Sequence, residues 1–161
     1  MNNEQIKELV SNKTFDLPNG LVLNLKEQPD DYTTIEDFVD CYGKVVQRNR
    51  HRYSGYGEQR PYEFDGKAEV IRTFDCEWWW QPPSDITKEQ IATMRSTVRE
   101  ILDWGFKTLV LEVCEGKDAY GKDIVRDYTT LGGIEPLLDD DYTIDIVQDM
   151  VQDLDMAVRD W

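Results

Sequence analysis

The sequence has few of the residues that usually perform catalysis. Its single histidine, His51, has no recognisable nucleophile motif beside it, and the chain lacks a glycine-rich loop suited to phosphates. Its three cysteines, Cys41, Cys76 and Cys114, are odd in number and far apart. This spacing argues against a disulfide framework and against a zinc site made from close cysteine pairs. We therefore expect free thiols, no metal, no cofactor and no enzymatic activity.

Long apolar segments are also missing. The longest uncharged apolar run lies around residues 78–80 and is far too short to cross a membrane. The N-terminus lacks the basic start and the apolar stretch of a secretion signal. With 40% hydrophobic and 32% charged residues, the 161-residue chain has the composition of a folded protein. We expect a cytoplasmic protein, away from membranes, that forms a single domain over residues 1–161.

Basic residues are scarce relative to acidic ones. Eighteen lysines and arginines stand against 33 aspartates and glutamates, which gives a net charge of −15. Residues 135–161 alone hold nine acidic residues and one basic residue, Arg159. A field of this sign repels nucleic acids and membrane surfaces and attracts basic proteins. Two interpretations stay open at this point: the charge serves binding, or it serves solubility only.

Hydrophobic periodicity and helix-capping signals predict an α+β fold. Thr87 and Gln90 form the capping-box pattern of a long helix that ends at Gly105. In chain order, the expected elements are a helix at 3–10, strands at 14–17 and 21–26 around a turn at 18–20, a helix at 34–43, a strand at 68–75 extended by 77–80, a helix at 87–105, strands at 106–115 and 124–130, a turn at 131–133 and a helix at 141–161. We expect a small, mainly antiparallel sheet packed by the two longer amphipathic helices.

The expected last helix separates apolar from acidic residues. At about 100° per residue, its apolar side chains fall within one arc of about 160°, and aspartates occupy the other side. Like charges four residues apart destabilise a helix, whereas acids just before it are favoured by the helix dipole. We predict that this acidic outer face binds a partner, with an exposed Trp79 as an anchor. The predicted contact residues are Asp139, Asp140, Asp141, Asp145, Asp149, Asp153 and Asp160.

Nucleic-acid mimicry is the most specific interpretation of this acidic face. Carboxylates four residues apart lie about 6 Å apart along a helix, which is about half the charge density of a DNA strand. Asp123, Asp127 and Glu135 are the acids that we expect to complete such a surface. In size and charge the chain resembles the small acidic proteins of phages and mobile elements that block restriction or CRISPR nucleases. The resemblance implies an anti-CRISPR or antirestriction inhibitor that engages the basic surface of a nuclease or another nucleic-acid-handling protein.

Residues 48–66 form a basic, tyrosine-rich segment in an otherwise acidic chain. Arginines among aromatic rings are typical of surfaces that contact phosphates and stacked bases. We expect a long mobile loop here, which is either solvated or folded against the chain's own carboxylates. The alternative function is an RNA- or nucleotide-binding module that uses Arg48, Arg50, Arg52, Tyr53 and Tyr56.

A second alternative is a metal-dependent hydrolase. Glu115 and Lys117 follow the Glu-x-Lys spacing of some metal-dependent nucleases, with Asp85 as the partner carboxylate. A pattern of three residues arises often by chance. The run at 139–141 lacks the glycine and the terminal glutamate of a calcium-binding loop. The sequence therefore favours a binding protein over an enzyme.

Overall fold

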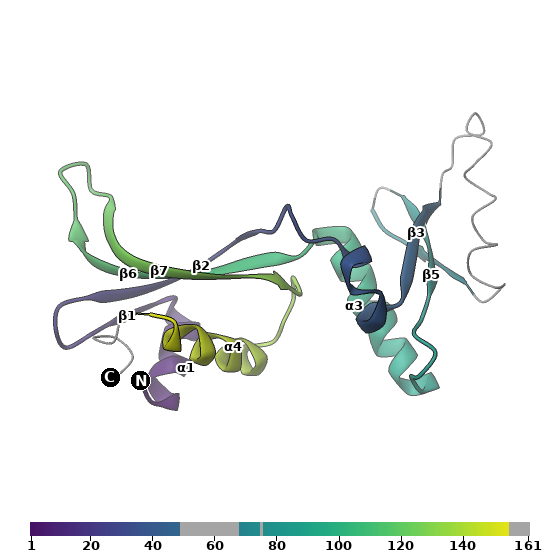
Figure 1. The fold of residues 1–161 in the computed structure, drawn as a ribbon, viewed down its shortest axis with the longest axis horizontal. Helices are drawn as coiled ribbons and strands as arrows, with labels where there is room; N and C mark the ends of the chain where they lie inside the picture. The colour runs from purple at the N-terminus through teal and green to yellow at the C-terminus, as the bar shows by residue number, and fades with distance from the viewer. Residues whose placement is uncertain (49–67, 75, 155–161) are drawn as a thin grey trace. The chain divides into compact units, whose positions relative to one another are not determined.

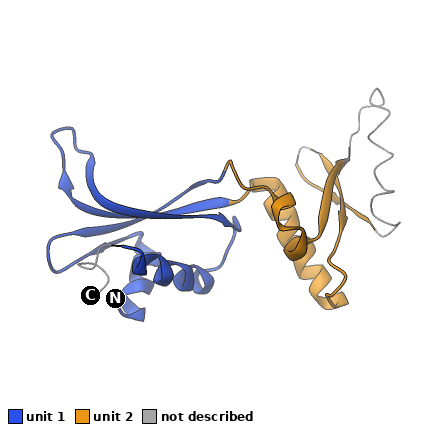
Figure 2. Cartoon of the chain, in the orientation of Figure 1, with its two compact units in different colours: residues 1–30, 107–161 blue, residues 31–106 orange. Residues whose placement is uncertain are grey.

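The computed structural model describes residues 1–48, 68–74 and 76–154 (Figure 1). The chain divides into two compact units, unit 1 (residues 1–30 and 107–161) and unit 2 (residues 31–106) (Figure 2). Each unit has an antiparallel sheet and a buried core, so the α+β class is confirmed, with two sheets where we predicted one. The single domain stays a prediction. Among the described residues, no helix is both long and apolar enough to cross a membrane.

Unit 1 is built on a four-stranded antiparallel sheet with the order β1-β2-β6-β7 (Figure 1). The strands are β1 (Thr14–Asp16), β2 (Val22–Pro29), β6 (Lys107–Lys117) and β7 (Asp123–Ile134). Successive residues of a strand point to opposite faces. In β2, Leu23 and Leu25 are therefore buried on one face, while Asn24 and Lys26 lie on the other. We call this second face the open face.

Two helices cover the buried face of the unit 1 sheet. They are α1 (Asn3–Asn12), which begins with a capping box between Asn2 and Gln5, and α4 (Asp140–Gln152) (Figure 1). Each apolar side chain buried between helices and sheet contributes about 1.5–3 kcal/mol to stability. The most deeply buried members of this core are Ile6, Leu9, Leu23, Leu109, Leu111, Val113, Val147 and Val151. Neither α1 nor α4 covers the open face.

Unit 2 contains a three-stranded antiparallel sheet with the order β3-β5-β4. Its strands are β3 (Lys44–Arg48), β4 (Glu69–Arg72) and β5 (Glu77–Gln81), and its helices are η1 (Ile35–Phe38, a 3₁₀ helix), α2 (Val39–Tyr42) and α3 (Lys88–Trp104). The predicted capping box of Thr87 and Gln90 starts α3, and Gly105 ends it. Trp80 is fully buried, and its Nε1 donates a hydrogen bond to the carbonyl oxygen of Tyr42 at 2.7 Å.

Two local predictions in unit 2 were wrong. Residues 77–80 do not extend the strand before them, because β5 folds back antiparallel to β4 and places Trp79 opposite Val70. The hydroxyl of Thr73 donates a hydrogen bond to the carbonyl oxygen of Cys76 where the chain reverses. The helix predicted at 34–43 is divided at Phe38, whose φ of −122° and ψ of 43° lie outside the helical region.

The turn predicted at 131–133 was also wrong, because these residues belong to β7. The two glycines there allow the backbone of β7 to come close to the side chain of Asp30. The backbone N of Gly133 donates a hydrogen bond to Oδ2 of Asp30 at 2.7 Å. A Cβ atom added to Gly132 would lie 2.7 Å from the same oxygen, which is too close for a side chain.

We predicted a last helix up to residue 161, but α4 ends at Gln152, and residues 155–161 lie outside the described part of the chain. The next two N–H groups donate to carbonyls three residues earlier, as in a 3₁₀ turn. Asp153 donates to Met150, and Leu154 donates to Val151. Leu154 is only 2% exposed. Leu154 therefore packs in the core of unit 1 with Val147 and Val151 of α4.

Candidate functional site

The acidic segment predicted from the sequence starts at the N-terminus of α4. Oδ1 of Asp139 accepts a hydrogen bond from the backbone N of Tyr142 at 2.9 Å, so Asp139 is the N-cap of the helix. Asp140 and Asp141 lie in the first turn, where the positive end of the helix dipole favours carboxylates. All three aspartates are exposed. Negative charge at this end therefore stabilises the helix.

Further along α4, the outer face carries the exposed residues Asp145 and Asp149, with the exposed Asp153 at the C-cap. Val147 and Met150 are buried on the inner face. Within the described residues, none of these aspartates lies within ion-pair distance of a basic side chain. The last turn of the helix holds no basic residue either. Repulsion between neighbouring aspartates costs a few tenths of a kcal/mol per pair, roughly. We call residues 139–141, 145, 149 and 153 the acidic face.

Two exposed apolar side chains that the sequence analysis missed lie beside the acidic face. Tyr142 and Leu137 are each 63% exposed. At about 100° per residue, Tyr142 shares one side of α4 with the residues three and seven positions later, Asp145 and Asp149. The sequence carried the signal for Tyr142, because it is an aromatic residue in the acidic arc of the helix. Exposed tyrosines are frequent anchors of protein interfaces.

Trp79, the predicted anchor of the contact, is half-buried and not exposed. It lies on the central strand β5, opposite Val46 of β3 and Val70 of β4. A side chain on a central strand has neighbours on both sides, which explains the loss of exposure. Trp79 also belongs to unit 2, whereas the acidic face belongs to unit 1.

Most of the predicted nucleic-acid-binding residues lie outside the described residues. Arg48 is the last residue of β3. The expected loop at 48–66 falls almost entirely in the range 49–67, which the structure does not describe. The predicted residues in that range, and at the C-terminal end, are Arg50, Arg52, Tyr53, Tyr56 and Asp160. The alternative function assigned to this loop stays a prediction.

The residues of the hydrolase motif are divided between the two units. Glu115 and Lys117 lie in β6 of unit 1, whereas Asp85 precedes α3 in unit 2. Lys117 lies 3.8 Å from Oδ1 of Asp123 and forms an ion pair with it. In the described parts of the chain, no three histidine, cysteine or carboxylate side chains are grouped so that they could hold a metal ion. The hydrolase alternative therefore gains no support.

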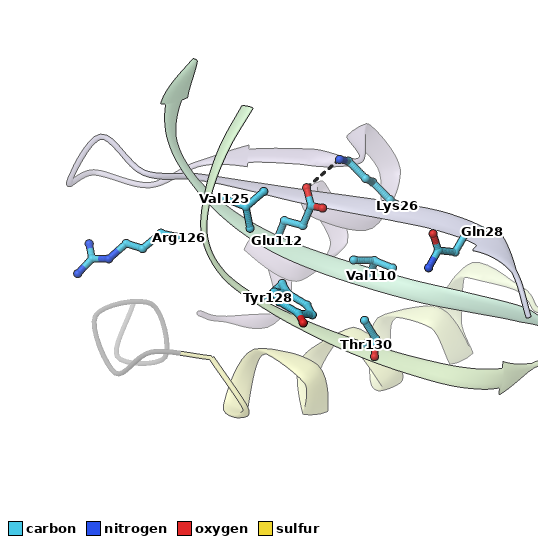
Figure 3. Close-up of a pocket in the computed structure, with 8 residues that line it drawn as sticks. All are labelled: Lys26, Gln28, Val110, Glu112, Val125, Arg126, Tyr128 and Thr130. Atoms are coloured by element: carbon cyan, nitrogen blue, oxygen red, sulfur yellow. Dashed lines mark ion pairs between the residues drawn. The ribbon is translucent and has the colours of Figure 1, made fainter. Parts of the chain in front are cut away.

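The open face of the unit 1 sheet carries a groove of about 620 Å³ (Figure 3). Tyr128 at this groove is 65% exposed, whereas Val110 is buried. Arg126 extends away from the other lining side chains (Figure 3). The groove thus has an apolar floor and a mostly polar rim. It is lined by Lys26, Gln28, Val110, Glu112, Val125, Arg126, Tyr128 and Thr130.

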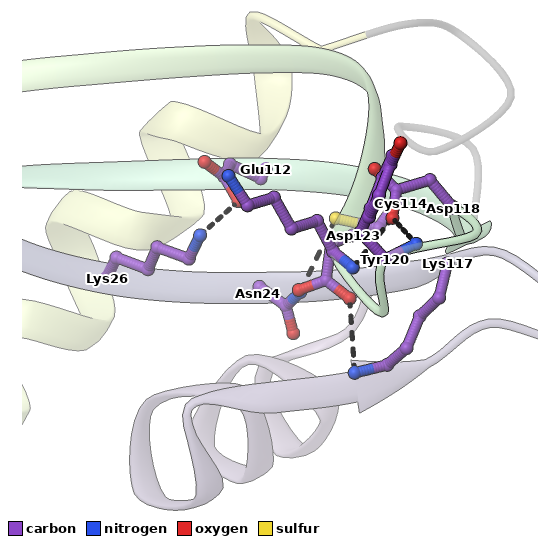
Figure 4. A network of polar contacts seen from close by, with 9 residues as sticks. Asn24, Lys26, Glu112, Cys114, Lys117, Asp118, Tyr120 and Asp123 are labelled. Carbon is purple, nitrogen blue, oxygen red and sulfur yellow. Dashed lines mark hydrogen bonds and ion pairs between the residues drawn. The ribbon is translucent and has the colours of Figure 1, made fainter.

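Polar side chains on the open face contact one another (Figure 4). Nζ of Lys26 lies 2.8 Å from Oε2 of Glu112 and forms an ion pair with it. This contact raises the pKa of Lys26. Nδ2 of Asn24 donates hydrogen bonds to Sγ of Cys114 and to Oδ2 of Asp123, both at 3.4 Å. Burial raises the pKa of the Cys114 thiol, and the nearby carboxylates raise it further.

The two surfaces of unit 1 differ in how their charges are balanced. On the open face, Lys26 is paired with Glu112 and Lys117 with Asp123, which leaves little charge for a partner. The acidic face presents exposed carboxylates of one sign. It is therefore the stronger candidate for a binding surface. No protein-family model matches the chain, and no curated protein or solved structure matches it significantly.

Proposed function

We propose that the protein is a non-enzymatic binding protein whose acidic face engages the basic surface of a nucleic-acid-handling protein. The observation that carries this proposal is the outer side of α4, where exposed aspartates have no ion-pair partner in the described part of the chain. Proteins that bind phosphates present arginines and lysines of the complementary sign. Occupation of that surface would inhibit the partner, as anti-CRISPR and antirestriction proteins do.

The charge is concentrated in the unit that carries α4. Unit 1 holds 19 acidic and 8 basic residues, a net charge of −11, whereas unit 2 holds 14 acidic and 10 basic residues, a net charge of −4. A field with this distribution draws a basic partner toward unit 1 and accelerates the encounter. Salt screens exposed charges over about 10 Å at 0.1 M. Binding through the acidic face should therefore weaken as salt rises.

Tyr142 and Leu137 give the acidic face an apolar element. Charges at the rim of an interface contribute mostly to association rate and specificity, while buried aromatic anchors contribute most of the affinity. Tyr142 lies next to the N-terminal aspartates and offers both a ring and a hydroxyl group. We assign it the role of anchor that the sequence had suggested for Trp79.

The acids predicted to complete a nucleic-acid mimic do not all lie beside α4. Asp123 contacts Asn24 and Lys117 on the open face, while α4 covers the opposite face of the sheet. Asp127 and Glu135 are half-buried. We therefore propose an acidic binding face, and not a phosphate-by-phosphate copy of a DNA strand.

Affinity capture with three tagged forms of the chain tests this proposal. The wild type, the variant Asp149→Lys/Asp153→Lys and the control Glu36→Lys/Glu115→Lys are incubated with host lysate over a salt series. Both variants change the net charge by the same amount, and both control residues are exposed and lie outside the acidic face. We expect the wild type and the control to retain a nucleic-acid-binding protein that added duplex DNA displaces. The Asp149/Asp153 variant should lose it.

Two outcomes contradict the proposal. Equal retention by the Asp149/Asp153 variant would show that α4 is not the interface. Equal loss in both variants would show that only the total charge matters.

Replacement of Tyr142 by alanine separates the anchor from the charges, because it leaves the formal charge unchanged. We expect Tyr142→Ala to weaken retention at every salt concentration.

A further inference from the structure

Three arginines line one pocket of unit 2, whereas the acidic face belongs to unit 1. The pocket has a volume of about 520 Å³ and is lined by Val70, Ile71, Arg72, Arg95 and Arg99. Arg72 comes from the end of β4, and the other two arginines come from successive turns of α3. The chain has a net charge of −15, yet the described residues that line this pocket include three arginines and no carboxylate.

Two of these guanidinium groups are held in position by carboxylates. Nε of Arg95 donates to Oε2 of Glu69 at 2.8 Å, and one terminal nitrogen donates to Oε1 at 3.0 Å. The same guanidinium lies 6.0 Å from the centre of the Trp80 ring. Nε of Arg72 lies 3.3 Å from Oε1 of Glu77. Because a guanidinium has five N–H donors, both arginines keep donors for a further anion.

The third arginine of the pocket, Arg99, differs from the other two. It is exposed, and within the described residues no carboxylate lies within ion-pair distance of it. Arg95 precedes it by four residues, which places the two side chains about 6 Å apart on one side of α3. A phosphate at this spacing can accept hydrogen bonds from both.

An exposed aromatic pair lies one helical turn beyond Arg99. Oδ1 of Asp103, four residues after Arg99, accepts a hydrogen bond from the backbone N of Phe74 at 3.0 Å. Phe74 is 81% exposed and Trp104 is 66% exposed, and their rings meet edge to face with centroids 6.1 Å apart. Large aromatic rings held at the surface are typical of interaction sites.

We propose that this surface of unit 2 binds a single-stranded nucleic acid, with a backbone phosphate in the arginine pocket and a base stacked on Phe74 or Trp104. Arginines beside exposed rings are the combination that such surfaces use, because every base offers a face for stacking. A duplex has no free base face, and an acidic peptide carries no base to stack. The site uses other residues than the acidic face, so its test does not depend on the proposed protein partner.

The charges around the pocket set the expected salt dependence. Glu69, Glu77 and Asp103 lie beside the three arginines, so the site takes up few phosphates and depends strongly on stacking. One or two phosphate contacts on a single strand give a slope of about −0.7 to −1.4 in a plot of log K against log salt concentration. A slope much steeper than this would indicate a larger cationic surface and would overturn the assignment.

Fluorescence anisotropy of a labelled 12-nucleotide single strand with the full chain tests the site. The variants are Arg99→Gln and Phe74→Ala, and the control is Lys88→Gln, an exposed cation in the first turn of α3 outside the pocket. We expect Arg99→Gln and Phe74→Ala each to weaken binding about 5- to 10-fold, by loss of a phosphate contact and of a stacking contact respectively. Lys88→Gln should bind like the wild type.

Several outcomes overturn the proposal. The first three are wild-type affinity in both Arg99→Gln and Phe74→Ala, tighter binding of a duplex of equal length, and competition by polyglutamate that Phe74→Ala does not change. The last result would assign the arginine pocket to acidic peptides. Absence of binding at about 50 mM salt, where phosphate contacts are strong, also overturns it. Thermal unfolding of each variant identifies a loss of binding that comes only from a loss of fold.

Discussion

Lys26 of β2 and Glu112 of β6 form a diagonal ion pair across the open face, with 2.8 Å between Nζ and Oε2. The two partners differ in solvent access, because the lysine side chain is 53% exposed and the glutamate side chain only 15%. Removal of the lysine therefore leaves a mostly buried carboxylate without its counter-ion. Removal of the carboxylate leaves an ammonium that water can solvate.

This difference predicts unequal effects of two substitutions. Lys26→Met should lower the free energy of unfolding by about 1–2 kcal/mol, since an unpaired buried acceptor costs more than a lost exposed ion pair contributes. Glu112→Gln should lower it by less than about 1 kcal/mol. Urea unfolding at pH 7 measures both values. A larger loss in Glu112→Gln would contradict the prediction.

The three cysteines should react with alkylating agents in the order of their exposure. Cys41 is exposed, Cys76 is half-buried and Cys114 is buried. Burial also raises the pKa of Cys114, which reduces the fraction of reactive thiolate. We expect iodoacetamide at pH 8 to label Cys41 first and Cys114 only after unfolding, as followed by mass spectrometry. Rapid labelling of Cys114 in the native protein would refute this order.

The raised pKa of Cys114 also links stability to pH. Above the ordinary thiol pKa of 9.0, the unfolded chain loses this proton while the folded protein retains it. The folded state then binds more protons than the unfolded state, so its stability falls as pH rises. We expect a smaller fall between pH 8 and 10 in Cys114→Ala than in the wild type, measured by urea unfolding. Equal falls would assign the effect to other groups.

We expect the acidic face to favour partner binding but to lower the stability of the folded protein. Asp149→Lys with Asp153→Lys removes like-charge repulsion and places cations near the negative end of the helix dipole of α4. We expect this variant to gain about 0.3–1 kcal/mol in stability while it loses the captured partner. Thermal unfolding against Glu36→Lys/Glu115→Lys provides the comparison. A melting temperature below that of the control would count against the prediction.

Asp139 combines a structural role with a place in the acidic face, and two substitutions separate them. Asp139→Ala removes the acceptor for the backbone N of Tyr142 and should cost about 1 kcal/mol of stability. Asp139→Asn keeps a side-chain acceptor, so its stability should stay close to that of the wild type. Both variants lose the charge and should retain less of the captured partner. If Asp139→Asn were as unstable as Asp139→Ala, the capping assignment would fail.

Local signals in the sequence were sufficient for most helix and strand positions. The capping box of Thr87 and Gln90 and the final Gly105 bound α3 as predicted. The strands on either side of the 18–20 turn pair antiparallel, as do β6 and β7. Capping and turn formation act between residues about four positions apart, so they can be recognised without the rest of the chain. The aspartates of α4 were found in the same way, because they depend on composition and helical period.

Contacts between distant segments were not accessible to such patterns. Lys26 of β2 lies opposite Val110 of β6, and Asp30 contacts Gly133. In both pairs, all residues of unit 2 lie between the partners in the sequence. Such pairings depend on loop closure and on burial of whole faces, which local preferences do not specify. The half-burial of Trp79 between two neighbouring strands follows from the same kind of contact.

The sequence by itself therefore determined the acidity of the chain, most of its local elements and the aspartates at the start of α4. Only the tertiary structure decided that the strands form two sheets and that the last helix ends at Gln152. It also brought together Arg72, Arg95 and Arg99, which no motif connects in the sequence. The physical reason is that charge and helix capping are local properties, whereas a shared surface arises only when segments far apart in the chain pack together.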